Sequence, residues 1–271
     1  MQWFAYILWI ALGLCFVAAI LSYFYCSFIK PRRDARQADT AVVEGANDGS
    51  VAVLNEHRWQ IVLAQTPYTE NEVPTGTQQR LVWAVDLFGV QRGWLCGEEM
   101  PMYPCLSFHN AVGDSIDFIG KQLKNRSSLR LYVVKPEGIE LDECVYEASV
   151  VLCFAAPVKY AQKTAWRYWP INVFWEWGYL PEQMQCCQIL YVALMAGCDV
   201  VGVEADFNDI YDLLEGKRIP KVLQNSAVDA SSVSQWNPTV FAHAGKTVTG
   251  QCDSTLSDRQ LKERIQQAGW K

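Results

Sequence analysis

The most apolar stretch of the chain lies at its amino-terminal end. Residues 1–29 carry no charged side chain, and most of them are aliphatic or aromatic. About 20 residues of this kind are enough for a helix to cross the hydrocarbon core of a bilayer. Aromatic residues gather at both ends of the stretch, as is typical of membrane interfaces. The pattern predicts a single transmembrane helix that anchors the chain in a lipid bilayer.

The charges beside this stretch predict its orientation. Four basic residues and one acidic residue follow it between positions 30 and 36. Because basic residues remain on the cytoplasmic side, we expect the amino terminus outside and the large domain in the cytoplasm, or in the matrix or stroma of an organelle. A cleaved signal peptide would need small residues after its apolar core, and bulky aromatic residues stand at positions 23–25 instead.

Three further segments follow from the change in composition along the chain. Residues 30–55 are largely small or polar, which predicts a flexible linker. Residues 56–225 hold dense apolar runs and are expected to fold as one α/β domain. Residues 226–271 turn polar again, and we expect an extended arm with one short strand at 239–243. A capping-box pattern at 257–260 predicts a terminal helix that ends at Gly269.

The apolar runs of the central domain fit a mixture of strands and helices. The run at 148–155 is apolar throughout, which is typical of a central strand covered on both faces. We expect the fold to be α+β, or α/β, with one mixed β-sheet covered by helices. Strands are predicted at 59–64, 81–88, 129–134, 148–155, 198–204 and 219–223. Helices are predicted at 114–123, at 184–196 and, with Asp206 as the cap, at 207–214.

Charge and residue composition exclude some classes of function. The net charge of −6 and a pI near 5.2 argue against nucleic acid as a partner, because phosphate backbones require a basic face. The chain has 10 cysteines, but no Cys-x-x-Cys pair, and its three histidines are widely spaced. We therefore expect no zinc or other metal site.

One segment suggests a nucleotide. Residues 196–206 have the pattern of a helix end, a glycine turn and a strand that closes on the acids Glu204 and Asp206. The segment resembles the second strand of S-adenosylmethionine-dependent methyltransferases, in which an acid at this place binds a ribose hydroxyl. The resemblance implies that Glu204 or Asp206 binds a cofactor. The alternative is that Glu204 is a solvated residue at a strand end and Asp206 caps the next helix.

A second resemblance extends over residues 129–224, which look like the distal half of nitroreductase-type flavoproteins. The elements that carry it are the strands at 131–135 and 149–156, the turn at 176–178, the helix at 188–197, the pair Leu213-Leu214 and the run 220–223. The resemblance implies an FMN-dependent oxidoreductase. Because that family's basic cluster for the flavin phosphate has no counterpart at residues 57–80, Arg126 and Arg130 would supply the phosphate contacts.

Tryptophan is concentrated between residues 166 and 177. Trp166, Trp169, Trp175 and Trp177 lie there together with an arginine. Tryptophan, tyrosine and arginine are favoured in the cores of protein interfaces. We expect the segment to form an exposed or semi-exposed contact with a protein partner, although it could also line a flavin pocket or fill the core.

Three functions remain open from the sequence. The first is a membrane-anchored interaction or assembly subunit, for which a degenerate nitroreductase-like fold would serve. The second is an active FMN-dependent oxidoreductase at the membrane. The third is an S-adenosylmethionine-dependent methyltransferase. The missing phosphate-binding cluster and the tryptophan-rich segment favour the first.

Overall fold

A computed structural model describes residues 53–141, 148–228, 236–246 and 255–270. Residues 52–271 form one compact unit. The predicted transmembrane helix at 1–29 and nearly all of the predicted linker lie outside the described residues. Among the residues that are described, no helix is both long and apolar enough to cross a membrane.

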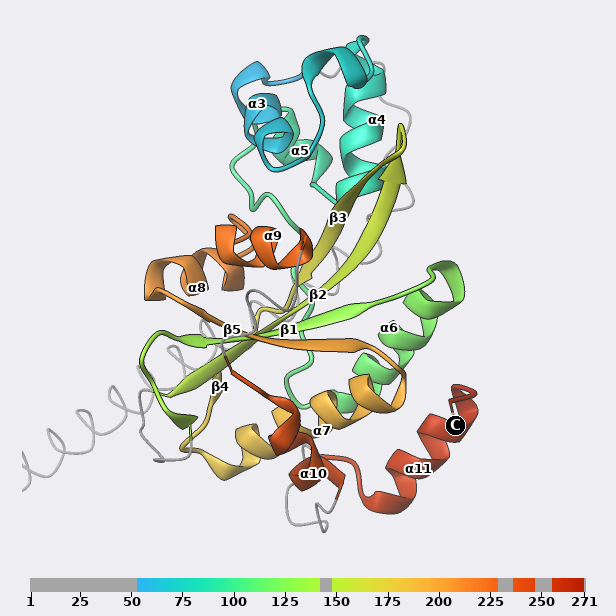
Figure 1. Ribbon diagram of the computed structural model, residues 1–271, viewed down its shortest axis with the longest axis vertical. Helices are drawn as coiled ribbons and strands as arrows, with labels where there is room; N and C mark the ends of the chain where they lie inside the picture. Colours follow the sequence, from blue (N-terminus) through green and yellow to red (C-terminus); the bar gives the residue numbers. More distant parts are fainter. Residues whose placement is uncertain (1–52, 142–147, 229–235, 247–254, 271) are drawn as a thin grey trace, which may run out of the picture. The chain divides into compact units, whose positions relative to one another are not determined.

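The domain is built on one open, mixed β-sheet, and the chain has an α+β fold (Figure 1). The strands are β1 (Arg130–Pro136), β2 (Ser149–Tyr160), β3 (Lys163–Pro170), β4 (Trp175–Glu176) and β5 (Asp199–Ala205). Their order is β3-β2-β1-β5, with β4 paired to the first residues of β2. β1 is antiparallel to β2 and parallel to β5, and β2 is antiparallel to β3. β1 and β2 are therefore the central strands, and both are buried on two faces.

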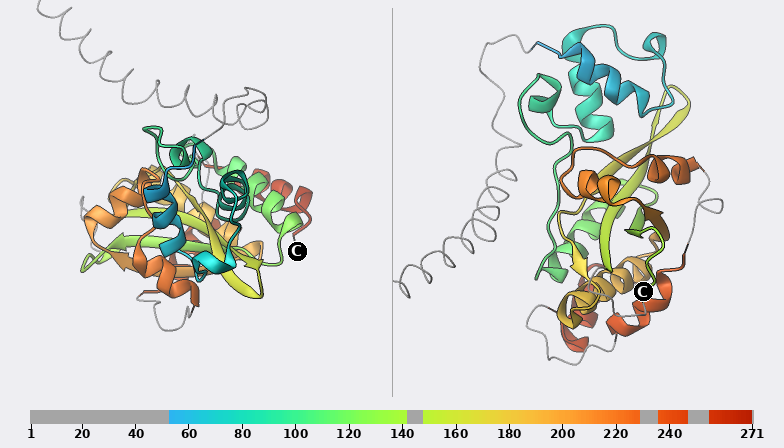
Figure 2. Two further views of the ribbon diagram at one scale, coloured as in Figure 1. Left: turned by 90° about the horizontal axis from the view of Figure 1, so that it is seen from above. Right: turned by 90° about the vertical axis from the view of Figure 1, so that its left-hand side faces the viewer.

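Two hydrophobic clusters cover the two faces of the sheet. The first joins the sheet to α3 (Glu56–Ala64), α4 (Thr77–Phe88), α5 (Arg92–Leu95), α8 (Phe207–Leu214) and α9 (Lys221–Val228). The second joins it to α6 (Val112–Asn125), α7 (Leu180–Met195), α10 (Thr239–Lys246) and α11 (Asp258–Gln267). The sheet thus lies between two helical layers (Figure 2). β2 and β3 run on together as a twisted ribbon that reaches α4 (Figure 1).

Two of the predicted strands are helices. Residues 59–64 lie in α3 and residues 81–88 lie in α4, so both strand predictions are wrong. Their aromatic and β-branched residues are typical of strands, but the buried positions recur every three or four residues. In α3 these positions are Trp59, Val62 and Leu63, which form one face of a helix. Asn55 caps α3 by accepting a hydrogen bond from the backbone N–H of Arg58 at 3.1 Å.

Two more predicted strands, both in the distal part of the chain, are also helical. The run at 219–223 enters α9, whose first turn is closed by the backbone N–H of Leu223 donating to the carbonyl of Pro220. The run at 239–243 lies in α10, where the Asn237 side chain accepts from the backbone N–H of Thr239 at 3.0 Å. α10 packs on α7, so this part of the expected arm belongs to the compact unit.

Several predictions are confirmed. The strands expected at 129–134, 148–155 and 198–204 are β1, β2 and β5, and the helices expected at 114–123, 184–196 and 207–214 are α6, α7 and α8. The terminal helix is α11, and Ser257 and Gln260 form its capping box. β3 was not predicted, because its sequence, KTAWRYWP, has no regular alternation of apolar and polar residues.

Candidate functional site

Trp175 and Trp177 belong to the core. Their exposed fractions are 0% and 1%, so the expectation of an exposed contact is wrong for both. Trp175 lies in β4 opposite Val150 of β2. The ring of Trp177 meets that of Phe241 in α10 edge to face, with the centroids 4.9 Å apart. Aromatic side chains bury large apolar areas, and here they fill the space between the sheet and the helices of the second cluster.

Trp166 and Trp169 of β3 lie against arginines. The guanidinium carbon of Arg130 is 4.7 Å from the ring centroid of Trp166, which is half-buried. The guanidinium carbons of Arg126 and Arg167 are 5.0 Å and 5.3 Å from the ring centroid of Trp169. The structure therefore pairs residues predicted for two different roles, but in two separate places, because Trp166 packs on the first hydrophobic cluster and Trp169 belongs to the second. At Trp169 it adds Arg167. Trp169 itself is buried, so its ring is not an exposed contact.

Arg130 is held by partners within the fold. Its Nε donates to Oδ2 of Asp199 at 2.7 Å, and Arg130 and Asp199 are opposite each other across β1 and β5. Its Nη1 also donates to the hydroxyl of Tyr132 at 3.1 Å. The charge of Arg130 is thus met by a carboxylate, and the residue ties the beginnings of β1 and β5 together.

Arg126 and Arg167 have a different environment, and we call them, with Trp169, the arginine cluster. Within the described part of the chain, neither arginine lies within ion-pair distance of a carboxylate. Nε of Arg126 donates to the Gln122 side chain at 3.2 Å. Nη1 of Arg167 donates to the carbonyl of Asp86, at the end of α4, at 2.6 Å. Nε of Arg167 is buried and has no hydrogen-bond partner.

The electrostatics of the arginine cluster follow from this arrangement. Burial lowers the pKa of Arg126. Burial also lowers the pKa of Arg167, the positive charge of Arg126 lowers it further, and the carboxylate of Asp86 acts in the opposite direction. Two like charges therefore lie near each other in a partly desolvated place, where each raises the energy of the other.

The acids Glu204 and Asp206 serve the fold. Oε1 of Glu204 lies 2.8 Å from Nζ of Lys135, which stands opposite it across β1 and β5. The Asp206 side chain caps α8 by accepting a hydrogen bond from the backbone N–H of Asp209 at 2.9 Å. This is the helix cap that the sequence offered as the alternative to a cofactor ligand. The register places Arg130 at the other end of β1 from Lys135, a separation on the order of 16 Å at the rise of a strand. Arg130 and Glu204 therefore do not meet around one small cofactor.

Five of the six described cysteines are not activated. All six are free thiols. Burial raises the pKa of Cys105, Cys187 and Cys198 to about 12. It also raises the pKa of Cys153 and Cys186 above the ordinary range. A thiol acts as a nucleophile or ligand through its thiolate, so these five side chains behave as small apolar groups. No cluster of three or more His, Cys, Asp or Glu side chains is placed to hold a metal ion among the residues described.

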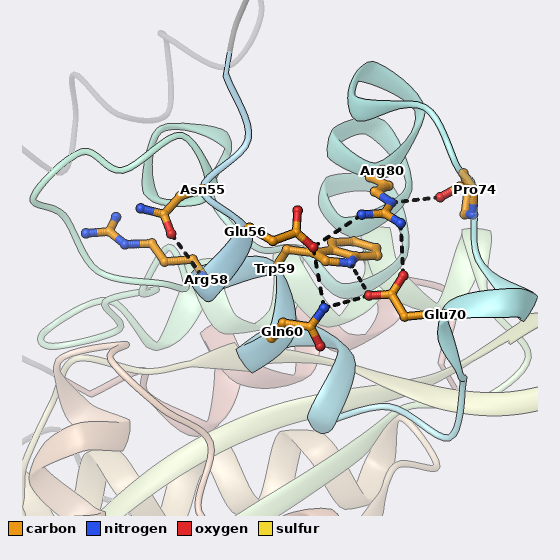
Figure 3. A network of polar contacts seen from close by, with 8 residues as sticks. All are labelled: Asn55, Glu56, Arg58, Trp59, Gln60, Glu70, Pro74 and Arg80. Carbon is orange, nitrogen blue, oxygen red and sulfur yellow. Dashed lines mark hydrogen bonds and ion pairs between the residues drawn. The ribbon is translucent and has the colours of Figure 1, made fainter.

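A polar network joins α3, the loop after it and α4 (Figure 3). Arg80 of α4 donates through Nε to the carbonyl of Pro74 at 3.0 Å, and its Nη2 lies 2.9 Å from the carboxylate of Glu70. Its guanidinium carbon is 5.0 Å from the ring centroid of Trp59, and the indole N–H of Trp59 donates to Glu70 at 3.1 Å. The network satisfies its own charges, so its role is to fasten α3 to α4.

An aromatic surface on α8 is the feature that the sequence analysis missed. Phe207 and Tyr211 are 47% and 52% exposed. They are four residues apart, so they share one side of the helix. The ring of Phe174 stacks on that of Tyr211, with the centroids 6.1 Å apart and the planes 9° from parallel. We call Phe174, Phe207 and Tyr211 the aromatic surface. The sequence did carry a signal for this surface, because α8 is a short helix with apolar residues on two sides. Ile210 and Leu213 form its buried side, which leaves Phe207 and Tyr211 on the other.

Comparisons with known proteins add no family. No protein-family model, curated protein or solved structure matches the chain. One element of the nitroreductase-like pattern differs from its expectation, since the residues after Pro220 form helix α9 and not a last strand. Function is therefore inferred from the residues of this chain.

Proposed function

We propose that the chain is a membrane-anchored interaction subunit. Residues 1–29 would hold it in the bilayer, and its α+β domain would contact a protein partner in the membrane complex through the aromatic surface. The supporting observation is that Phe207 and Tyr211 are about half exposed on one helix, with Phe174 stacked on Tyr211. Contiguous exposed apolar side chains mark interaction sites, whereas single exposed apolar residues are ordinary, and aromatic residues are enriched among the hot spots of interfaces.

The aromatic surface is held in place by the fold. Asp206 caps α8, and Ile210 and Leu213 are fully buried beneath it. Arg218, which follows α8 in the chain, forms ion pairs with two acids of that helix, Asp209 at 2.7 Å and Asp212 at 2.9 Å. A surface that is ordered before binding loses little conformational entropy when the partner arrives. This rigidity favours a specific contact.

Apart from Arg126, the residues that the sequence assigned to a cofactor are engaged otherwise. Arg130 and Glu204 are ion-paired within the sheet, and Asp206 is a helix cap. Five described thiols have a raised pKa because they are buried. These engagements favour an interaction subunit over the FMN-dependent oxidoreductase and over the methyltransferase. A visible absorbance spectrum of the full-length protein in mild detergent tests the first alternative, because stoichiometric FMN would favour the oxidoreductase over the interaction subunit.

The test of the contact uses substitution on α8. The double variant Phe207→Ser/Tyr211→Ser removes two exposed aromatic rings and leaves the buried face of the helix intact. Val240→Ser is the matched control, since Val240 is an exposed apolar residue on α10. Full-length tagged protein would be purified from its native membrane in mild detergent. We expect a stoichiometric partner with the wild type and with Val240→Ser, and its loss in the double variant, since each hot-spot side chain contributes about 2 kcal/mol or more.

Two results would contradict the proposal. One is an unchanged partner in the double variant, at unchanged thermal stability. The other is a wild-type protein that elutes alone at every detergent concentration that keeps it folded.

A further inference from the structure

The arginine cluster lies apart from the aromatic surface. Trp169 belongs to the hydrophobic cluster on one face of the sheet, whereas α8 packs on the other face. We propose that Arg126 and Arg167 form a binding site for a phosphate group. This site is independent of the contact proposed for α8, and its occupant would be a phosphate ester.

The first argument is charge. Two guanidinium groups lie against one indole ring, at 5.0 Å and 5.3 Å from its centroid, and the charge of Arg126 is close enough to lower the pKa of Arg167. The nearest acid that acts on Arg167 is Asp86, whose side chain is exposed and outside ion-pair distance. Contact with the ring face stabilises a cation without neutralising it. A bound dianion would relieve the repulsion and satisfy both charges at once.

The second argument is the set of free donors. Nε of Arg126 donates a hydrogen bond to the side chain of Gln122, and Nη1 of Arg167 donates to the carbonyls of Val85 and Asp86. The two Nη atoms of Arg126 and Nη2 of Arg167 have no acceptor among the described residues. These are the N–H groups with which arginine binds phosphate oxygens in a fork. Because the end of α4 fixes Arg167 and the ring of Trp169 supports both groups, the donors are held in place before a ligand binds.

The third argument concerns the kind of anion. A carboxylate carries one charge and is fully matched by one guanidinium. A phosphate monoester carries close to two charges at neutral pH and three acceptor oxygens, which suits two guanidinium groups. Since the ring of Trp169 is buried beneath the arginines, it offers no free face for a base or flavin to stack on. The cluster therefore recognises the phosphate group, which could belong to a soluble ester or to a lipid headgroup.

The experiment measures binding to the full-length protein in mild detergent by isothermal titration calorimetry. The probes are inorganic phosphate, glycerol 3-phosphate and a short-chain phosphatidate below its micelle concentration, with sodium chloride at matched ionic strength as the blank. We expect saturable binding of all three phosphates. Equal affinity for the last two would identify a soluble ester, and tighter binding of phosphatidate would identify a lipid headgroup. Binding no stronger than that of chloride would overturn the proposal.

Variants locate the site. Arg126→Gln should weaken phosphate binding by at least about tenfold, because charged hydrogen bonds are lost. Arg126→Lys keeps the charge but not the fork, so its affinity should lie between those of Arg126→Gln and the wild type. Arg259→Gln, on an exposed arginine of α11, is the control and should bind as the wild type does. Undiminished binding in Arg126→Gln would overturn the proposal.

A second measurement needs no variant. Phosphate should raise the thermal unfolding temperature of the wild-type protein above its value in chloride at equal ionic strength, because a ligand that binds only the folded state stabilises it. An equal unfolding temperature in the two salts would count against the site.

Discussion

Lys135 lies opposite Glu204 across the parallel strands β1 and β5, with Nζ 2.8 Å from Oε1 of the carboxylate. Lys135 is only 2% exposed. Its ammonium group also donates to the carbonyl of Ile139 and lies 5.9 Å from the ring centroid of Trp236. A carboxylate, a carbonyl and an indole ring thus surround the buried charge of Lys135. The ion pair with Glu204 holds the carboxyl ends of two parallel strands together.

Removing one member of this pair should cost far more stability than replacing both. Glu204→Leu leaves the buried charge of Lys135 without its carboxylate, and the free energy of unfolding should fall by about 3–5 kcal/mol. The double variant Lys135→Met/Glu204→Leu should recover most of that loss, since two apolar groups need no counter-charge. Urea unfolding of the four proteins of this cycle measures both values. A double variant no more stable than Glu204→Leu would show that the ion pair is not the source of the effect.

The link between Glu72 and Lys163 predicts a dependence of stability on pH. Their side chains lie 2.7 Å apart and join the loop after α3 to the start of β3. The hydrogen bond from Lys163, aided by Thr69, lowers the pKa of Glu72 from 4.5 to about 2. A lowered pKa in the folded state stabilises the fold above pH 4.5, and this contribution disappears as the pH falls to about 2.

Glu72→Gln should remove that contribution. The difference in free energy of unfolding between the wild type and this variant should be constant above pH 4.5, shrink below it, and vanish near pH 2. Denaturant unfolding at a series of pH values gives the difference directly. A difference that stays constant down to pH 2 would mean that Glu72 titrates normally in the folded protein.

Gly245 sets the close approach of α10 to α7. A Cβ atom added at Gly245 would lie 2.2 Å from the backbone carbonyl oxygen of Cys187. Gly245→Ala must therefore push the two helices apart, at a cost of about 1–3 kcal/mol that exceeds the gain in helix propensity. Gly120→Ala in α6 is the matched control, because its Cβ would meet Trp270 at an ordinary 3.8 Å. That control should be neutral or stabilising by up to about 1 kcal/mol, and thermal unfolding compares the two.

Thiol labelling tests the assignment of the buried cysteines to the core. Cys153, Cys186 and Cys187 are buried, and burial raises the pKa of each thiol. We expect iodoacetamide to label these three in the native protein at least about a hundredfold more slowly than in the unfolded one, because the thiolate is the reactive species. Peptide mass spectrometry follows each site separately. Rapid labelling of Cys186 in the folded protein would show an opening of α7 that the packing does not predict.

The sequence predicted the elements whose patterns are strong. The apolar runs that became β1, β2 and β5 are continuous, and Asp206 and Ser257 mark the starts of α8 and α11 as helix caps. It failed where residue type and spacing disagreed. Trp59, Val62 and Leu63 have the spacing of a helix, but the preference of Trp59 and Val62 for strands obscured it.

The candidate sites were harder to predict, because they depend on distant segments. Arg126 and Trp169 were both named from the sequence, but in different roles, and nothing local shows that Arg167 joins them from β3. The burial of Trp175 follows from its pairing in β4, which is too short to have a pattern of its own. The stacking of Phe174 on Tyr211 likewise joins residues that are far apart in the chain.

The most direct measurement is site-specific photo-crosslinking from the aromatic surface. A benzophenone side chain would replace Tyr211 in the full-length protein in the cells that produce it, with the same substitution at the exposed Arg259 of α11 as the control. An interaction subunit predicts one discrete protein adduct from position 211, its loss when Phe207 is also changed to serine, and no such adduct from position 259. The same adduct from both positions, or none from position 211, would contradict a partner on α8.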